Sequence, residues 1–324
     1  MSHAIVMHKT GGPEVLEWSS RSRDAPAKGE VRIRHTAIGL NFIDTYHRTG
    51  LYPLPLPATP GLEAAGVIEA MGSGVEGFSV GDRVAYPAGP AGAYAQERNF
   101  PAARLVKLPD EVSDEDAAAL MLKACTVEYL IFRTFAVKPG DTVLFHAAAG
   151  GVGLIACQWL KALGVTTIGT VGSDAKADLA RAHGCQHTIN YTREDFVERV
   201  QEITGGEGVP VVYDSVGKDT FKGSLEVLRR RGTLVTFGNA TGPVEPFSPG
   251  LLALKGSLFV TRPTLMDYVA TRDELELCTT RVFDAIANGH IKAEINQRYA
   301  LKDAQAAHTA LEARATTGQT ILQP

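Results

Sequence analysis

The stretch VLFHAAAGGVGLIACQWLKALG, Val143–Gly164, decides the fold of this 324-residue chain. It opens with an apolar run typical of a buried strand, continues through three alanines and two glycines, and ends in a helix-period pattern that stops at Gly164. The apolar side chains of that pattern recur three and four residues apart, as on a helix packed against a sheet: Val152, Ile155, Ala156, Trp159, Leu160 and Leu163. The stretch therefore predicts a strand, a glycine turn and a helix.

The same alternation continues to about residue 260. Strand-like runs are VTTIGTVG, HTIN, VPVVYDSVG, TLVTFGN and GSLFVTRP, and the helical segments between them are DAKADLARAHG, REDFVERVQEIT and DTFKGSLEVLRRRG. Strands that alternate with helices of this length indicate an α/β fold with a doubly wound parallel sheet, the Rossmann arrangement. A further long helix is expected over about Asp267–Asn288.

The N-terminal third has a different pattern. Short strand-like runs such as EVRIRHTAIG and AAGVIEAMGSG are separated by Gly- and Pro-rich turns, which is typical of a small β-barrel. We expect a barrel domain over residues 1–123, a dinucleotide-binding domain over 124–263 and a C-terminal segment over 264–324.

Composition narrows the functional classes. The chain is 44% hydrophobic and 21% charged with a net charge of −4, which argues against a nucleic-acid or anionic-membrane partner. No apolar run reaches the length of a membrane span, and the N-terminus does not resemble a signal peptide. The four cysteines are scattered without a CxxC motif, as expected of free thiols in a cytoplasmic protein.

The glycine turn predicts a phosphate site. Amide groups at a helix N-terminus bind a diphosphate well, and glycines allow its close approach. The residues expected to contact it are Ala149, Gly150, Gly151, Val152 and Gly153. Ala147 stands where the usual fingerprint has its first glycine, which predicts a slightly wider turn. An ordinary tight turn is the alternative, but the position in the first unit of a βαβ series favours a dinucleotide.

The second strand indicates which dinucleotide binds. An NAD site usually has an acidic residue at this strand tip to hold the ribose diol, whereas the tip here is Val171–Ser173. Asp174 follows, but Ser173 or Asp174 could equally cap the next helix. Lys176 and Tyr191 could reach a 2′-phosphate, so NADPH is the expected cofactor, and Ser173 is expected among its contacts. Solvation of Lys176 at the surface is the alternative.

Several motifs together resemble a known family. NFIDTYHRTGLYP, PGLEAAGVI, GDRVAY, HAAAGGVGLIACQWLKALG, VYDSVG and KGSLFVTRP are similar to those of the zinc-independent quinone oxidoreductases, relatives of the zeta-crystallins in the medium-chain dehydrogenase/reductase superfamily. The resemblance covers nearly the whole chain. It implies a GroES-like barrel, a Rossmann domain, return of residues 264–324 to the barrel, and a homodimer in which SLFVTR pairs across the interface.

The resemblance also implies site residues. Lys123 and Thr126 would lie where the barrel meets the cofactor, and Ser215 and Gly217 would border the adenine. Phe237, Gly238 and Asn239 would approach the carboxamide, as their place at a strand end also indicates. Arg314 would contact a phosphate, or it is an ordinary surface arginine.

No metal is expected. Metal-dependent members of the superfamily hold zinc where this chain has Asn41, Leu62 and Lys123. Cys125 lies two residues from Lys123, but one thiol cannot supply the three or so protein ligands that a catalytic zinc needs.

Chemistry without a metal requires a substrate that accepts hydride readily, and quinones meet this condition. Asn41 could bind the nicotinamide ribose or a developing oxyanion, and Tyr46 and Tyr52 could stack on a quinone and donate a hydrogen bond. Asp44 is the nearest acid, although a loop carboxylate is more often a cap or an ion-pair partner. Tyr52 could instead pack its own loop.

The leading hypothesis is an NADPH-dependent quinone reductase that forms hydroquinones or semiquinones. The alternatives are an NADPH-dependent reductase of enones or 2-alkenals, and a crystallin-like protein that binds NADPH with little turnover.

Overall fold

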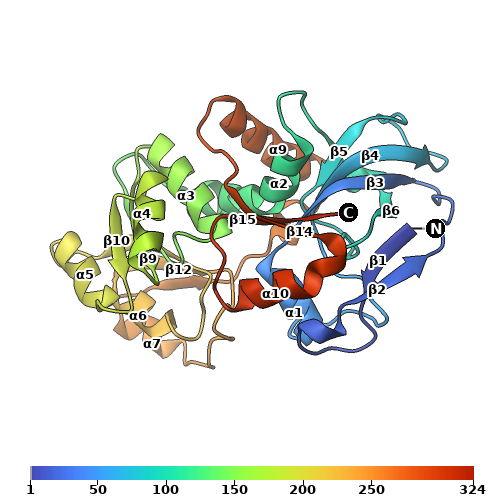
Figure 1. Cartoon of the computed structure of the whole chain (residues 1–324). Coiled ribbons are helices and arrows are strands. Elements are labelled where there is room, and N and C mark those ends of the chain that lie inside the picture. The colour runs from blue at the N-terminus through green and yellow to red at the C-terminus, as the bar shows by residue number, and fades with distance from the viewer. Residues whose placement is uncertain (1) are drawn as a thin grey trace. The chain divides into compact units, whose positions relative to one another are not determined.

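A computed structural model describes residues 2–324 and divides the chain into two compact units. One unit runs to Cys125 and includes Tyr268–Pro324, and the other is Thr126–Asp267. The division falls inside a single helix, α2 (Asp114–Glu128). Figure 1 labels the elements of both units.

The unit Thr126–Asp267 contains a six-stranded parallel sheet. Its order is β10-β9-β8-β11-β12-β13, that is, third, second, first, fourth, fifth and sixth along the chain. This order, which reverses at the first strand, is that of the Rossmann fold, so the predicted fold class is confirmed. The strands are β8 (Thr142–Phe145), β9 (Thr166–Val171), β10 (His187–Asn190), β11 (Val209–Asp214), β12 (Leu228–Thr236) and β13 (Phe259–Thr261).

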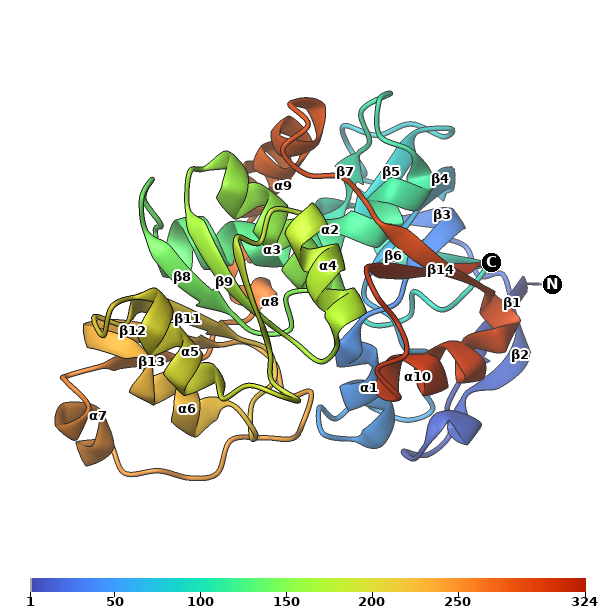
Figure 2. The same ribbon diagram turned by 60° about the vertical axis from the view of Figure 1, so that its left-hand side comes forward.

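Helices cover both faces of this sheet (Figures 1 and 2). On one face α3 (Gly151–Ala162) and α4 (Asp174–Ala182) bury small residues such as Ala148, Ala177 and Ala180. On the other face α5 (Phe196–Ile203) and α6 (Phe221–Glu226) pack on larger aliphatic side chains. The small side chains of the first face let its helices approach the sheet closely. Shorter pieces are η3 (Tyr129–Thr134), a π-helical turn, α7 (Gly250–Leu254) and α8 (Leu265–Tyr268).

Two predicted helices have different bounds in the structure. The segment DTFKGSLEVLRRRG was expected to be one helix, but α6 ends at Glu226 and β12 begins at Leu228. The strand can form there because Leu228 packs in the sheet core while the arginines that follow remain exposed. The helix expected over Asp267–Asn288 is divided into α8 and α9 (Arg272–Ala287), because Thr271 caps a new helix through the amide of Glu274.

The other unit is built on a seven-stranded sheet with a two-stranded ribbon beside it. The order is β14-β15-β3-β4-β5-β7, with β6 also paired to β3. The C-terminal strand joins it through the pairs Ile321 with Gly39 and Leu322 with Ile38. The predicted barrel is confirmed. Its strands are β1 (Ser2–Val6), β2 (Glu17–Arg21), β3 (Glu30–Gly39), β4 (Ala64–Met71), β5 (Arg83–Tyr86), β6 (Glu97–Pro101), β7 (Val106–Lys107), β14 (Ile295–Ala300) and β15 (Gln319–Gln323).

This unit also has helices that the strand pattern did not predict. The segment after β3, interpreted as a loop, forms α1 (Phe42–Thr49). The other helix, α10 (Ala304–Glu312), precedes the last strand, and both of these elements are as the sequence of the tail LKDAQAAHTALEARATTGQTILQP predicts. Three short 3₁₀ turns complete it: η1 (Pro13–Val15), η2 (Ala102–Arg104) and η4 (Leu301–Asp303). The core lies between the sheet and α10, with Ile33, Ile38 and Leu322 at its centre.

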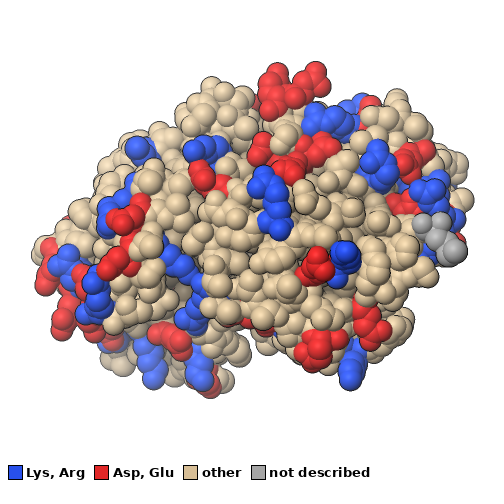
Figure 3. All heavy atoms as spheres, viewed as in Figure 1, with Lys and Arg blue, Asp and Glu red and all other residues tan. Residues whose placement is uncertain are grey.

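The surface carries charges of both signs. On the face drawn in Figure 3, Lys and Arg side chains are interspersed with Asp and Glu, without a continuous basic area. Among the described residues, no helix combines the length and apolarity that crossing a membrane requires.

The closest backbone approach around the first Rossmann strand occurs at Gly153. A Cβ placed on this glycine would lie 2.4 Å from the carbonyl oxygen of Ala147 and 2.7 Å from the Cα of Ala148. Both neighbours are backbone atoms and cannot turn aside as a side chain would. The contact between β8 and α3 therefore requires glycine at this position.

We expect G153A to destabilise the protein by about 2 kcal/mol, since a buried methyl group would push α3 from the sheet. Urea denaturation measures the change. Gly250 is the control, because a Cβ there meets only the hydroxyl of Ser248 at 3.5 Å, and G250A at the start of α7 should leave stability unchanged or slightly raised. Equal effects of the two substitutions would contradict this account.

Candidate functional site

The turn between β8 and α3 supplies no side-chain cap to its helix. Gly150 is the N-cap of α3 and has no side chain to cap the first-turn amides, whereas Ser173 and Asp195 cap the next two helices. Ala147 adopts a left-handed conformation with φ of 55°, which replaces the usual first glycine. An uncapped helix N-terminus at the end of a parallel strand fits a diphosphate.

The tip of β9 is arranged differently from that of an NAD site. Ser173 accepts a hydrogen bond from the Lys176 amide at 3.3 Å and so caps α4. Asp174 accepts one from Asn190 Nδ2 at 3.0 Å and pairs with Arg193. Asp174 is thus held by Asn190, the last residue of β10, and by Arg193, which follows that strand.

Tyr191 lies over the same tip. Its hydroxyl oxygen is 2.6 Å from the point where a Cβ on Gly172 would be, and 45% of the residue is exposed. Lys176 is in the first turn of α4, close to this tip in sequence. Ser173, Lys176 and Tyr191 therefore lie, respectively, just after the end of β9, in the first turn of α4 and directly after β10.

The ends of β11 and β12 contact each other through their backbones. A Cβ on Gly238 would lie 2.3 Å from the carbonyl oxygen of Ser215, and the Phe237 amide donates to the Asp214 carbonyl at 2.7 Å. Arg262, which follows β13, donates to the Gly238 carbonyl at 3.0 Å. The sequence analysis missed Arg262, because a single arginine after a strand gives no pattern.

These strand ends share one edge of the sheet. Because all six strands are parallel, their carboxyl ends meet at the same edge, where doubly wound sheets bind ligands. That edge holds every cofactor residue predicted within β8–β12: Ala149, Gly150, Gly151, Val152, Gly153, Ser173, Lys176, Tyr191, Ser215, Gly217, Phe237, Gly238 and Asn239. The remaining three lie elsewhere in the chain, Lys123 and the buried Thr126 in α2 and the exposed Arg314 after α10.

In the barrel unit, the predicted catalytic residues gather on and after α1. Asn41 is the N-cap of this helix, and its backbone amide donates to Asp44 Oδ2 at 3.0 Å. The Asn41 side-chain amide donates to Glu63 Oε2 at 2.8 Å. The two ring centroids of Tyr46 and Tyr52 are 5.2 Å apart in an edge-to-face arrangement, which is a favourable aromatic contact.

Asp44 is completely buried, so its carboxylate does not line a surface. Besides the Asn41 amide, its Oδ2 accepts the Tyr94 hydroxyl at 2.9 Å, while its Oδ1 has no partner. Burial raises the pKa of Asp44 to about 7. The structure therefore gives Asp44 the capping role that the sequence analysis held open, with a carboxyl group that titrates near neutral pH.

A line of buried groups extends from Asp44 to the C-terminal helix. The Tyr94 hydroxyl lies 3.0 Å from His308 Nε2, and Arg48 Nη1 lies 3.1 Å from His308 Nδ1. Arg48 also pairs with Glu312 at 2.6 Å. Burial and the adjacent Arg48 lower the pKa of His308 to about 3, so His308 is neutral. Since arginine can only donate, His308 accepts at Nδ1 and donates from Nε2 to Tyr94.

Comparison with known proteins agrees with this architecture. Residues 27–110 match the model of the alcohol dehydrogenase GroES-like domain, and residues 151–271 match that of the zinc-binding dehydrogenases. A quinone oxidoreductase of Pseudomonas aeruginosa is 54% identical over the full length of both chains. The chain belongs to the quinone oxidoreductase family. This family lies within the medium-chain dehydrogenase/reductase superfamily, as the resemblance in the sequence implied.

Two further similar proteins extend the comparison. The crystal structure of Escherichia coli quinone oxidoreductase complexed with NADPH superposes with a TM-score of 0.98 at 51% identity, covering 99% of this chain and 100% of the other. A 2-haloacrylate reductase from a Burkholderia species is 47% identical over 100% of this chain and 99% of its own.

Zinc-binding dehydrogenases hold their metal with N, S or O ligands, and the corresponding residues of this chain are of a different kind. At the positions predicted from the zinc-dependent members, Leu62 is buried and apolar, and Lys123 is a buried cation 3.1 Å from Glu63 Oε2. The same carboxylate oxygen accepts Asn41. Within residues 2–324, no group of three His, Cys, Asp or Glu side chains could hold a metal ion. An ammonium group occupies the place where a cation would need ligands, so these residues do not fit catalytic zinc.

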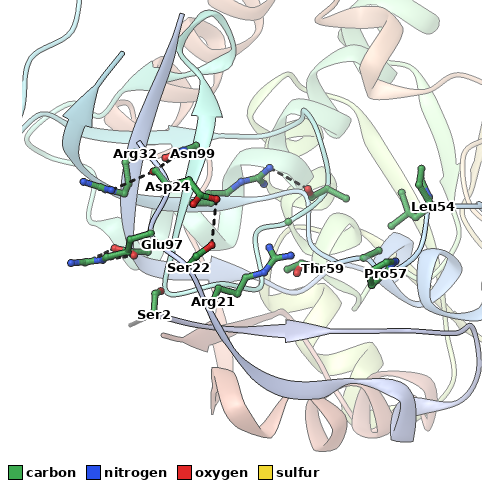
Figure 4. A pocket seen from close by; sticks show the side chains of 16 residues that line it. Ser2, Arg21, Ser22, Asp24, Arg32, Leu54, Pro57, Thr59, Glu97 and Asn99 are labelled. Carbon is green, nitrogen blue, oxygen red and sulfur yellow. Dashed lines mark hydrogen bonds and ion pairs between the residues drawn. The ribbon is translucent and has the colours of Figure 1, made fainter. Parts of the chain in front are cut away.

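A hollow of about 580 Å³ in the barrel unit is a separate feature (Figure 4). None of the predicted site residues lines it. Two of its charged groups have protein partners, since Arg23 pairs with Glu97 and Arg98 donates to the carbonyls of Pro90 and Ala91 at 3.1 Å. We assign the hollow no part in the site.

The titration of Asp44 predicts a pH dependence of stability. Its folded pKa of about 7 exceeds its ordinary 3.8, so between about pH 4 and 7 the folded state holds a proton that the unfolded state has lost. Stability therefore falls as pH rises through this window. D44N keeps the shape of the neutral form, and its stability relative to the wild type should rise by about 2–3 kcal/mol from about pH 5 to pH 8.

Urea denaturation of both proteins at the two pH values measures this difference. The exposed Asp110 is the control. The difference in stability between D110N and the wild type should be the same at both pH values. A D44N difference that does not change with pH would contradict the burial of an ionisable Asp44.

Proposed function

We propose that the protein catalyses the NADPH-dependent reduction of quinones without a metal. The observation that carries this proposal is that the chain has two features: a dinucleotide edge in the unit Thr126–Asp267, and, in the barrel unit, the Lys123–Glu63 ion pair near the positions where the zinc-dependent members have metal ligands. Family membership at 54% identity over the full chain supports it. When bound, NADPH supplies a hydride; every other contribution is made by residues of this chain.

The cofactor fits the residues at the edge of the parallel sheet. The open terminus of α3 receives the diphosphate, and Gly153 and Gly238 provide room that a Cβ would fill. Lys176 and Tyr191 bind the 2′-phosphate, and Asp174 does not repel it because Arg193 and Asn190 hold that carboxylate. Ser215, Gly217, Phe237 and Asn239 border the rest of the cofactor, with Lys123, Thr126 and Arg314 as further contacts.

The barrel unit supplies the substrate groups. Tyr46 and Tyr52 place aromatic faces and hydroxyl groups for a flat acceptor, and Asn41 is oriented by Glu63. Asp44 acts through Asn41 and the start of α1, because no atom of its side chain is exposed. Reduction to a hydroquinone also consumes one proton, which the structure does not assign to a residue.

The buried cysteines also suit a quinone substrate. Cys125, Cys157, Cys185 and Cys278 are all free and buried. Quinones are electrophiles that add to accessible thiolates, and a buried thiol in apolar surroundings is unreactive. The protein can therefore turn over quinones without modification of its own thiols.

A second candidate is the reduction of an activated C=C bond, as in enones or 2-alkenals. The observation in its favour is the 47% identity to a protein described as a 2-haloacrylate reductase. The same hydride chemistry serves both acceptors, so the shape of the substrate pocket decides between them.

Two further features are proposals. The edge strand β13 exposes Phe259 by 61%, which supports a homodimer that pairs this strand with its copy. A cytoplasmic location, inferred from the scattered free cysteines, is proposed on the same footing.

The purified protein should oxidise NADPH when given 1,4-benzoquinone or a naphthoquinone, with EDTA present and no metal added. Loss of NADPH absorbance measures the rate, and an enone and a 2-alkenal are run in parallel. Faster turnover of enones would favour the second candidate. A shift in melting temperature on adding NADPH without turnover of any acceptor would indicate the crystallin-like alternative.

K176A should weaken NADPH binding about ten- to a hundredfold and leave NADH binding nearly unchanged, because it removes one charge-assisted hydrogen bond to the 2′-phosphate. Calorimetry with each nucleotide measures both affinities. K161A, which removes an exposed lysine from the last turn of α3, is the control. An unchanged preference for NADPH in K176A would remove Lys176 from the site.

A further inference from the structure

Four buried side chains connect the glycine loop to the turn after β11. The Ala147 amide lies 3.3 Å from Thr170 Oγ1, which is 2.9 Å from His146 Nδ1. His146 Nε2 is 3.0 Å from Ser224 Oγ, which is 3.3 Å from Asp214 Oδ2. His146, Asp214 and Ser224 have no exposed surface, and Thr170 is 2% exposed.

A count of hydrogen atoms fixes the direction of this series of hydrogen bonds. The four contacts have four hydrogens available if His146 is neutral: one each on the Ala147 amide, Thr170, His146 and Ser224. The amide can only donate, and the Asp214 carboxylate can only accept. Each contact receives one hydrogen only if every bond points from Ala147 toward Asp214, which places the histidine proton on Nε2.

The other protonation states of His146 leave one contact without a hydrogen or one buried hydrogen without an acceptor. With the proton on Nδ1, Ser224 must donate to His146, and its contact with Asp214 has no hydrogen. A doubly protonated ring supplies five hydrogens for four contacts and leaves one buried hydrogen without an acceptor. Burial also lowers the pKa of His146, in agreement with a neutral ring.

The series of hydrogen bonds begins and ends in the two segments that border the cofactor edge. Ala147 holds a left-handed φ of 55° that an alanine adopts only under constraint. Asp214 Oδ1 accepts the amides of Val216 and Gly217 at 2.7 and 3.1 Å, which shapes the turn containing Ser215. Hydrogen bonds in series strengthen one another at low dielectric. The glycine loop and the turn after β11 are therefore held in a fixed position relative to each other.

We propose that Thr170, the Nε2–H tautomer of His146, and Ser224 are positioning residues for NADPH, which hold the glycine loop in register with the Asp214 turn. This inference rests on the proposed function for its ligand. None of the three touches the cofactor edge directly, because all are buried beneath it. They act through the backbone of Ala147 and of the turn at residues 214–217.

The test uses conservative variants of the two ends. T170V and S224A each remove one hydroxyl, and each should raise the dissociation constant of NADPH about tenfold in calorimetry, the usual effect of losing one buried hydrogen bond. The double variant should also be about tenfold weaker than the wild type, because both changes break the same chain. Thr167 is the control: it lies on the same strand, is fully buried, and its hydroxyl has no partner, so T167V should bind NADPH as the wild type does.

A second readout needs no ligand. The ¹⁵N and ¹H resonances of the His146 ring should show the Nε2–H tautomer in the wild type. An Nδ1–H tautomer, or a doubly protonated ring at neutral pH, would overturn the hydrogen count on which the inference depends.

The binding outcomes separate this inference from the proposed function. If the wild type binds NADPH and T170V and S224A bind it equally well, with only a lower melting temperature, the residues are structural and the inference is wrong. An additive hundredfold loss in the double variant would also overturn it, because the two hydroxyls would then act independently. If the wild type itself bound no NADPH, the proposed function would fail and this inference with it.

Discussion

The structure of the cofactor edge depends on the close contact between α3 and the end of β8. A methyl group on Gly153 would lie 2.4 Å from a carbonyl oxygen, so the helix is nearer to the sheet than any other residue would allow. That closeness brings the amides of the first turn to the carboxyl edge of a parallel sheet, where the helix dipole favours an anion. The preceding turn contains Ala147, which has a left-handed backbone with φ of 55°. The strained turn then needs the buried hydrogen bonds beneath it.

The barrel unit replaces a metal centre with a fixed internal charge pair. Lys123 and Glu63 are both buried and 3.1 Å apart, and Glu63 also accepts the Asn41 amide and the backbone amide of Leu122. A buried carboxylate with three donors is well compensated, and removal of one partner from such a pair is strongly destabilising. The pair therefore holds Asn41 in one orientation at the start of α1. The substrate has to be reactive enough without a Lewis acid, which is why a quinone fits better than an alcohol or a simple ketone.

The sequence was most informative where the local residue pattern itself determines the backbone structure. Strand and helix periods, with glycines where a Cβ would clash, predicted the Rossmann sheet, the barrel and the edge that carries Gly150–Gly153. The α1 helix was missed because NFIDTYHRT has few apolar residues, although Asn41 and Asp44 have the spacing of a capping pair. The start of β12 was assigned to a helix because three arginines favour helix locally, whereas pairing with β11 decides the structure. Arg262, Tyr94 and His308 could not be found, since tertiary contacts between distant segments leave no local signal.

Each unit contains a series of buried hydrogen bonds that ends on a carboxylate, Asp214 in one and Asp44 in the other. The two carboxylates accept different numbers of hydrogen bonds. Asp214 accepts hydrogen bonds on both oxygens: Oδ1 accepts the amides of Val216 and Gly217, and Oδ2 accepts the hydroxyls of Thr220 and Ser224. Asp44 receives two donors on Oδ2 and none on Oδ1. A buried carboxylate is stabilised in its charged form by the hydrogen bonds it accepts, so the shortage at Asp44 is why burial dominates and raises its pKa to about 7. Uptake of a proton on Oδ1 removes the buried charge, and Oδ2 can still accept its two hydrogen bonds. A change of pH near neutrality is therefore expected to act on the start of α1, where Asn41 is held, while the hydrogen count at His146 keeps the glycine loop in a single arrangement.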